Sequence, residues 1–186
     1  GFGAAIADRL HADGAAIVGL DVEPADGRHP LIAVDLADRQ ARQPAIDAAI
    51  RLLGGIDVLV NAAGVFREGS IVDSEPSDWT ALWAVDLEAP IDLMRLVAPA
   101  MTTQGFGRIV NITSIHATLG QPGCLAYDVA KAGLEAVYST ASGSWRWRGS
   151  RTRRVRRGRC RWPRLPCCRR DAAGRGLPPA RAEAVL

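Results

Sequence analysis

Four short, mostly apolar runs constrain what this chain can fold into more than any other feature. They cover residues 15–20, 31–34, 56–60 and 107–112, and each has the length of a strand. Runs that are apolar at nearly every position are typical of strands buried on both faces, as in parallel sheets. Helical periodicity alternates with them, over residues 1–10, 38–53, 75–104 (interrupted near Pro90) and 127–140. The alternation predicts an α/β fold with a doubly wound parallel sheet.

Polar residues follow each predicted strand. Asp21, Asp35, Asn61 and the pair Thr113-Ser114 stand directly after the four runs. The carboxyl ends of parallel strands meet at one edge of the sheet, where open α/β sheets bind their ligands. The sequence therefore predicts a binding site at this edge.

Tyr127 and Lys131 are four residues apart in the last predicted helix and so lie on one helix face. A lysine ammonium close to a phenol favours the phenolate by Coulomb attraction, which makes the tyrosine a usable general acid or base. Ser114 precedes this pair at the end of a predicted strand, and its hydroxyl could hold a substrate oxygen. Taken alone, Tyr127 and Lys131 could equally be two neighbours on a solvated helix face.

Residues 143–186 differ from the rest of the chain in charge. Residues 1–142 carry 9 Arg or Lys and 18 Asp or Glu, whereas residues 143–186 carry 14 arginines and 2 acidic residues. The second segment also lacks apolar periodicity. We therefore expect one globular domain over residues 1–142 and an irregular, Arg-rich tail over residues 143–186. The arginines and tryptophans of this tail raise one alternative function, a nucleic-acid- or anion-binding protein.

The four cysteines form no regular framework and no paired C-x-x-C motif; they are Cys124, Cys160, Cys167 and Cys168. We therefore expect neither a disulfide scaffold nor a metal site. The sequence shows no signal peptide and no apolar run near the roughly 18 residues of a membrane span. These features predict a cytoplasmic protein.

Three linked motifs resemble the classical short-chain dehydrogenase/reductase family. Asn61-Ala62-Ala63-Gly64 is similar to the family's Asn-Asn/Ala-Ala-Gly signature, Ile109–Ser114 to its Ile-Val-Asn-Ile-Ser-Ser stretch, and Tyr127 with Lys131 to its Tyr-x-x-x-Lys. The resemblance covers residues 1 to about 141. It implies a Rossmann-like fold and an oxidoreductase that transfers a hydride between NAD(P) and a secondary alcohol or ketone, such as a 3-oxoacyl compound. A non-enzymatic scaffold that keeps this fold is the second alternative.

The resemblance implies a role for each matching residue. Tyr127 would exchange a proton with the substrate oxygen, Lys131 would promote its ionisation and bind the nicotinamide ribose, and Ser114 would orient the substrate. Where the family often has an asparagine that completes a proton relay, this chain has Asp86. An ionised aspartate only accepts hydrogen bonds, so we expect the relay to be altered. Asp86 could bind the relay's water or could simply cap or kink its helix.

The resemblance also implies how a dinucleotide binds. Asp21 follows Gly3 at the distance of the acid that binds the adenosine ribose hydroxyls. Its charge would repel a 2′-phosphate, so we expect NAD and regard NADP as less favoured. Asp35-Leu36 resembles the pair that contacts the adenine, and Asn61-Ala62-Ala63-Gly64 would lie on the nicotinamide side. Both acids could also be ordinary polar residues at strand ends.

The chain departs from the family at both ends. Gly1-Phe2-Gly3 matches the end of the family's Gly-x-x-x-Gly-x-Gly phosphate loop, so we expect the first strand to be missing. Residues 143–186 show no pattern of the family's C-terminal strands. Residues 145–148, Trp-Arg-Trp-Arg, read one base earlier would give an apolar-Ala repeat, which suggests a frameshift near residue 142. We therefore expect an incomplete sheet and no normal activity in the chain as written.

Between Ser114 and Tyr127, the residues His116, Gln121 and Cys124 are expected to border the substrate pocket. The expected partners are a small alcohol or ketone and further copies of this chain. The family usually forms dimers or tetramers through its long helices, so we expect a homodimer or homotetramer. We expect no specific nucleic acid and no membrane as a partner.

Overall fold

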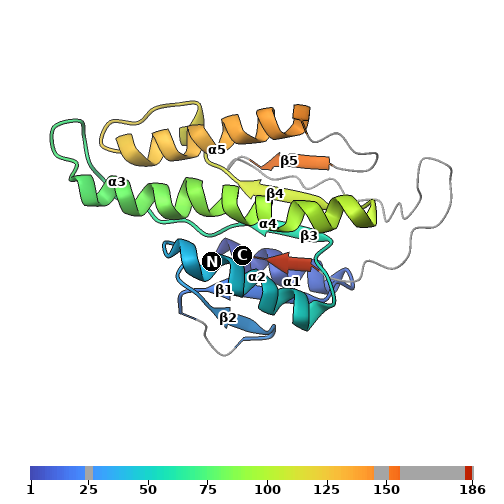
Figure 1. Ribbon diagram of the computed structural model, residues 1–186. Coiled ribbons are helices and arrows are strands. Elements are labelled where there is room, and N and C mark those ends of the chain that lie inside the picture. The colour runs from blue at the N-terminus through green and yellow to red at the C-terminus, as the bar shows by residue number, and fades with distance from the viewer. Residues whose placement is uncertain (24–26, 145–150, 156–182, 186) are drawn as a thin grey trace.

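The computed structural model describes residues 1–23, 27–144, 151–155 and 183–185. Its six strands are β1 (Ile17–Asp21), β2 (Leu31–Ala33), β3 (Val58–Asn61), β4 (Arg108–Ile112), β5 (Arg151–Val155) and β6 (Glu183–Val185). They form one sheet in the order β2-β1-β6-β3-β4-β5, with every neighbouring pair parallel (Figure 1). The predicted α/β fold with a parallel sheet is confirmed.

The helices are α1 (Phe2–Ala12), α2 (Arg39–Leu53), α3 (Pro76–Trp83), α4 (Ala89–Gln104) and α5 (Leu125–Ser144), with a π-helical turn η1 (Ala84–Glu88) and a 3₁₀ turn η2 (Ile115–Ala117). The sequence explains the bounds of α2. At its start the Asp38 carboxylate accepts a hydrogen bond from the Gln40 backbone N–H at 2.8 Å. At its end Gly54 adopts φ +77°, a left-handed conformation that favours glycine.

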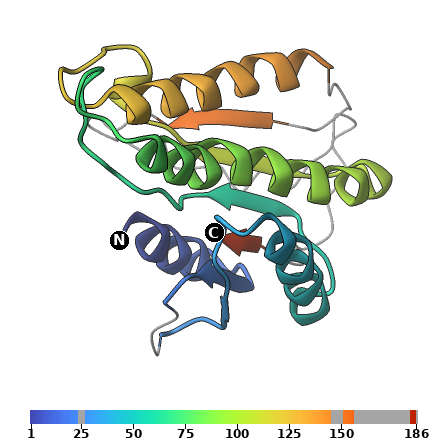
Figure 2. The same ribbon diagram turned by 60° about the vertical axis from the view of Figure 1, so that its left-hand side comes forward.

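Helices cover both faces of the sheet (Figure 2). On one face, α2 and α4 enclose the larger core together with side chains of β1, β3 and β4. On the other face, Ala7 of α1 packs against Ile17 and Val60, which point opposite to their strand neighbours Val18 and Leu59. Every residue of β1 up to Asp21 is buried, as expected for a strand covered on both sides. Among the described residues, no helix is long and apolar enough to cross a membrane.

The structure corrects the expectation for the middle of the sheet. We expected an incomplete sheet without its first strand, but in the described residues β1 and β3 share a neighbour. Residues 183–185 form β6 between them, with Ala184 in register with Val18 on one side and Leu59 on the other. The backbone N–H and C=O groups of two central strands need partners, and β6 supplies them.

The structure also places a strand from the Arg-rich tail at the edge of the sheet. Residues 151–155 form β5, which pairs with β4 from Arg108 to Ile112. The expectation of an irregular tail without strands therefore does not hold for residues 151–155 and 183–185. The boundary at residue 142 stays a prediction. The proposed frameshift concerns residues that lie mostly outside the described ones.

The long predicted helix over 75–104 is continuous, with a π-helical turn where an interruption was expected. Pro90 has no N–H to donate to the carbonyl of Asp86, four residues earlier. The preceding residue, Ala89, donates its N–H to the carbonyl of Ala84, five residues earlier, which gives the π-helical turn η1. A π-turn shifts the side chains that follow around the helix axis and is often found at functional sites. Here it carries Asp86, which is completely buried.

A buried arginine, Arg42 of α2, joins three parts of the fold. It donates hydrogen bonds to the carbonyls of Leu36 at 2.9 Å and Ala84 at 3.1 Å, and to the Asp92 carboxylate at 2.6 Å. Burial acts to raise the pKa of Asp92, but this bond and the charges of Arg42 and Arg39 outweigh it and lower the pKa. Arg42 thus connects the loop after β2 to the start of the π-turn.

We predict that Arg42→Met destabilises the protein by about 3 kcal/mol, because three acceptors lose a buried donor and Asp92 loses its shortest ion pair. The free energy of unfolding in urea measures this. Arg39→Ala is the matched control, since Arg39 contacts the same carboxylate at 3.3 Å but is 71% exposed. It should cost less than about 1 kcal/mol. Equal losses in both variants would contradict this role of Arg42.

Candidate active site

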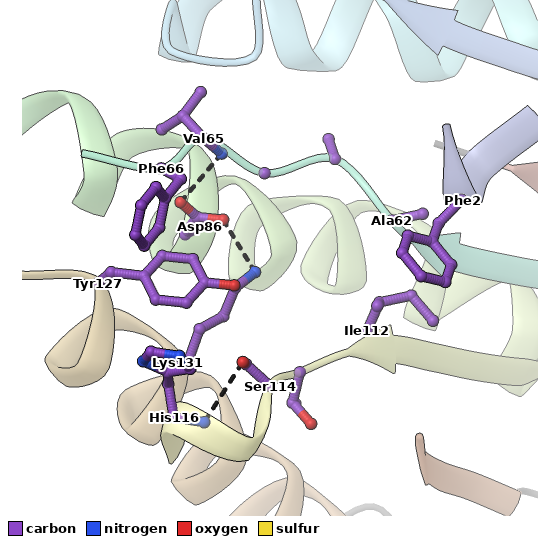
Figure 3. A pocket seen from close by; sticks show the side chains of 13 residues that line it. Phe2, Ala62, Val65, Phe66, Asp86, Ile112, Ser114, His116, Tyr127 and Lys131 are labelled. Carbon is purple, nitrogen blue, oxygen red and sulfur yellow. Dashed lines mark hydrogen bonds and ion pairs between the residues drawn. The ribbon is translucent and has the colours of Figure 1, made fainter. Parts of the chain in front are cut away.

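A cavity of about 350 Å³ opens at the carboxyl ends of β3 and β4, beside the first turns of α5 (Figure 3). Segments far apart in the sequence build its wall. The lining residues are Phe2, Ala62, Ala63, Gly64, Val65, Phe66, Asp86, Ile112, Thr113, Ser114, His116, Tyr127 and Lys131. The cavity therefore lies at the edge of the sheet where the sequence predicts a binding site, and it contains the predicted Ser114, Tyr127 and Lys131.

Tyr127 stands in the first turn of α5 with its hydroxyl directed into the cavity (Figure 3). Its ring is held from two sides by edge-to-face contacts, with Phe66 at 5.1 Å and His116 at 5.4 Å between ring centroids. One turn later, the Lys131 Nζ lies 5.6 Å from the centroid of the Tyr127 ring. The predicted pairing on one helix face is therefore present, and the face is turned inward rather than toward solvent.

Ser114 ends β4 and caps the 3₁₀ turn η2. Its side chain is buried, and its Oγ accepts a hydrogen bond from the His116 backbone N–H at 3.3 Å. An accepting hydroxyl keeps its own proton to donate, so Ser114 can donate to an oxygen placed in the cavity.

Lys131 forms a buried ion pair with Asp86 of the π-turn. Its Nζ is 2.8 Å from Asp86 Oδ1, and the Val65 backbone N–H donates to Oδ2 at 3.2 Å. Burial raises the pKa of Asp86, and the Lys131 charge and the Val65 N–H oppose this rise without cancelling it. Asp86 therefore does more than cap or kink a helix: it fixes the ammonium beside Tyr127.

Glycine is the only residue type that fits at position 64, next to the Asp86 carboxylate and the Lys131 ammonium. A Cβ built on Gly64 would lie 2.5 Å from Asp86 Oδ1 and 3.4 Å from Lys131 Nζ. Any larger residue would push the carboxylate away from the ammonium. The glycine that ends the Asn61-Ala62-Ala63-Gly64 motif is thus required by the ion pair behind it.

Asn61 does not line the cavity. It is buried, and its side-chain amide donates to Asn111 Oδ1 at 2.7 Å. The two residues are also paired in the register of β3 and β4. Asn61 therefore fastens these two strand ends together below the cavity.

The residues predicted to bind the adenosine half lie outside the cavity. Asp21 and Asp35 are exposed at strand ends, and their carboxylates accept backbone N–H groups, from Glu23 at 3.2 Å and from Ala37 at 2.8 Å. Leu36 is buried in the larger core. The structure does not bring these three residues together with Tyr127.

The N-terminus of α1 lies at the same edge. Gly1 caps it, Phe2 lines the cavity, and a Cβ on Gly3 would lie 3.7 Å from Ala62 Cβ. The first backbone N–H groups of a helix attract anions such as a pyrophosphate. These N–H groups and the exposed carboxylate of Asp21 are the groups at this edge that could hold a dinucleotide.

Some predictions for the pocket border hold and others do not. His116 lines the cavity, whereas Gln121 and Cys124 do not. Burial raises the pKa of the Cys124 thiol. Sequence reasoning missed two lining residues that carry no motif of their own, namely Val65 and Phe66. In the described part of the chain, no cluster of three His, Cys, Asp or Glu side chains could hold a metal ion.

The fold and the cavity define an α/β protein with a binding cavity at the carboxyl edge of its parallel sheet, and comparison with known proteins places it further. A family model described as enoyl-(acyl carrier protein) reductase matches residues 1–163. The short chain dehydrogenase adrF of Penicillium rubens is 35% identical over 155 residues, which are 80% of this chain and 60% of that protein. The chain belongs to the short-chain dehydrogenase/reductase family.

Two further relatives extend the comparison. The D-threitol dehydrogenase of Mycolicibacterium smegmatis is 33% identical over 167 residues, covering 83% of this chain and 64% of that protein. The crystal structure of a metagenomic short-chain oxidoreductase in complex with NADP matches with a TM-score of 0.79 and 33% identity, over 87% of this chain and 79% of that one. The chain spans about 60% of the length of the first curated relative.

We predict that Asp86→Asn removes a pH dependence of stability. A carboxyl group whose pKa is raised in the folded state binds its proton more tightly there than in the unfolded chain. The wild type should therefore gain stability relative to Asp86→Asn as the pH falls through the raised pKa toward 3.8. Urea unfolding of both proteins at a series of pH values measures the difference.

Glu88→Gln is the control for this series, because Glu88 lies in the same π-turn and is exposed. Its stability should follow that of the wild type across the same pH range. A constant difference between the wild type and Asp86→Asn at all pH values would show that burial does not govern the ionisation of Asp86.

Proposed function

We propose that the cavity catalyses hydride transfer between a nicotinamide dinucleotide and a secondary alcohol or ketone. The observation that carries this is the convergence of three groups on one cavity: the Tyr127 hydroxyl, the Ser114 hydroxyl and the buried Lys131 ammonium. Membership of the short-chain dehydrogenase/reductase family supports the same reaction.

Each residue of the cavity has a role that follows from its position. When bound, the nicotinamide supplies the chemistry of accepting or giving the hydride at the substrate carbon. Tyr127 takes the proton of the alcohol oxygen during oxidation and returns it during reduction. Ser114 donates to the same oxygen and stabilises the charge that develops there. Lys131 places its ammonium beside the Tyr127 ring, and Asp86 holds that ammonium in place.

For the cofactor, we propose NAD, selected by Asp21 at the end of β1. An exposed carboxylate at this position can accept hydrogen bonds from the two ribose hydroxyls and would repel a 2′-phosphate. The structural relative described above binds NADP, so NADP is an equal competitor and only a comparison of both cofactors decides.

For the substrate, the partners and the location, we propose only general classes. A 3-oxoacyl compound or a similar carbonyl is one candidate, and the relative named for D-threitol acts on a polyol. We also propose a homodimer or homotetramer and a cytoplasmic location, on the grounds of the resemblance and the sequence. A nucleic-acid-binding tail and a non-enzymatic scaffold are the functions that remain if no turnover is found.

We predict that Tyr127→Phe lowers product formation by about 10²-fold to 10⁴-fold, because the general acid or base is removed. Since we expect the chain to turn over slowly, the measurement uses protein in excess of 2-butanol with NAD, and product is quantified after long incubation. Binding of NADH, followed by its fluorescence, should be unchanged. Equal product from both proteins would reject Tyr127 as the acid or base.

We predict that Asp21→Asn shifts the cofactor preference toward NADP by about tenfold or more, because a negative charge that repels the 2′-phosphate is lost. Titration with NADH and NADPH gives the ratio of the two dissociation constants. Asp13→Asn, an exposed acid at the far end of α1, is the control and should leave this ratio unchanged. An unchanged ratio in Asp21→Asn would remove the basis for proposing NAD.

A further inference from the structure

We propose that His116 contacts the substrate and selects alcohols that carry a second hydroxyl next to the reacting one, by accepting a hydrogen bond from that hydroxyl at its Nε2. This names a substrate class, vicinal diols and polyols, for the function proposed above and rests on it. The argument starts from the position of the ring and continues with the partner that fixes its proton.

The His116 ring lies beside the Tyr127 ring, in the same cavity wall as Ser114. It lies two residues after Ser114, whose Oγ accepts the His116 backbone N–H, and its ring meets the edge of the Tyr127 ring at 5.4 Å. The side chain is 18% exposed and lines the cavity (Figure 3). A substrate whose reacting oxygen lies between Ser114 and Tyr127 therefore has the imidazole as its next neighbour.

Asp128 fixes the orientation of this imidazole. Its Oδ1 is 2.6 Å from His116 Nδ1, and its Oδ2 accepts the Gln121 backbone N–H at 2.7 Å. Asp128 is only 13% exposed, so solvent competes little for these bonds. With both oxygens engaged, the carboxylate cannot turn away from the ring.

This contact determines which ring nitrogen carries the proton. An ionised carboxylate only accepts hydrogen bonds, so Nδ1 must be the donor. A neutral imidazole with a proton on Nδ1 has its lone pair on Nε2. Of the two ring nitrogens, Nδ1 is the one that has a polar partner among the described residues, and this partner is Asp128. When the ring is neutral, Nε2 is therefore a hydrogen-bond acceptor on a side chain that lines the cavity.

An acceptor in this place discriminates between alcohols. A diol can donate its second hydroxyl to Nε2, whereas a monoalcohol places a methyl or methylene group against it and leaves the nitrogen without a partner. One neutral hydrogen bond corresponds to roughly a tenfold preference in affinity. A carboxylate beside the reacting carbon would be disfavoured, because two acceptors would face each other.

The test measures the ring directly and does not need turnover. The protein has three histidines, His11, His29 and His116, so labelling with ¹⁵N-histidine and long-range ¹H–¹⁵N NMR gives few signals, and His116→Gln assigns the signal of His116. We expect the Nδ1-protonated tautomer at pH 7.5. The His116 Nε2 resonance should then shift on addition of 2,3-butanediol at concentrations about tenfold lower than those needed with 2-butanol.

Two variants separate a substrate contact from a structural role. Asp128→Asn can donate to Nδ1, so the ring can move its proton to Nε2, and the preference for the diol should be lost. His29→Gln is the matched control. His29 lies away from the cavity and forms a comparable pair, with 3.1 Å between its Nε2 and Asp8 Oδ1. It should leave the diol response unchanged. Thermal unfolding of each variant shows whether the fold is kept.

Several outcomes would overturn the inference: a proton on Nε2 in the wild type, an equal response to both alcohols, or tighter binding of 2-hydroxybutyrate than of the diol. If the diol response is lost only together with folding in Asp128→Asn, a His116→Phe protein decides, since its ring has no hydrogen-bond acceptor and it must bind both alcohols equally. Failure of the proposed oxidoreductase function would appear separately, as absent NADH binding or product formation that does not depend on Tyr127.

Discussion

The buried contact between Lys131 and Asp86 positions most of the cavity. An ammonium and a carboxylate can leave water together only if their geometry is held closely, because each alone would be strongly disfavoured in the interior. The π-turn brings Asp86 inward, Gly64 leaves the space for its carboxylate, and the Val65 N–H takes its second oxygen. The strand end after β3, the long helix and α5 are thereby fastened to one another at the place where Tyr127 stands.

Much of this arrangement could be predicted from the sequence, because it depends on local patterns. The apolar runs indicated the strands, and the polar residues after them indicated the edge where the cavity lies. The spacing of Tyr127 and Lys131 gave their shared helix face. Asp86 was identified by position, but its partner was not, because the contact depends on how a π-turn rotates the side chain. No local sequence pattern predicts an ion pair between residues on different helices.

The His116–Asp128 contact and strand β6 were missed for a related reason. Both result from packing between segments that the sequence presents separately. The irregular, Arg-rich composition after residue 143 argued against strands there. However, the backbone N–H and C=O groups on the facing edges of β1 and β3 need hydrogen-bond partners. This requirement comes from the rest of the sheet, so the strand propensity of residues 183–185 alone could not reveal it.

The position of β6 also has a consequence for how the molecule is assembled. Its pairing joins Ile17 and Val58 to Glu183, so the centre of the sheet depends on contacts between the most distant parts of the chain. Long-range parallel pairing is slow, since loop closure must precede any gain from the contacts. During synthesis the β2-β1 and β3-β4 halves emerge first, each with an open inner edge. Those edges are exposed to pairing with other chains until residues 183–185 are made, and before that point aggregation would compete most strongly with folding.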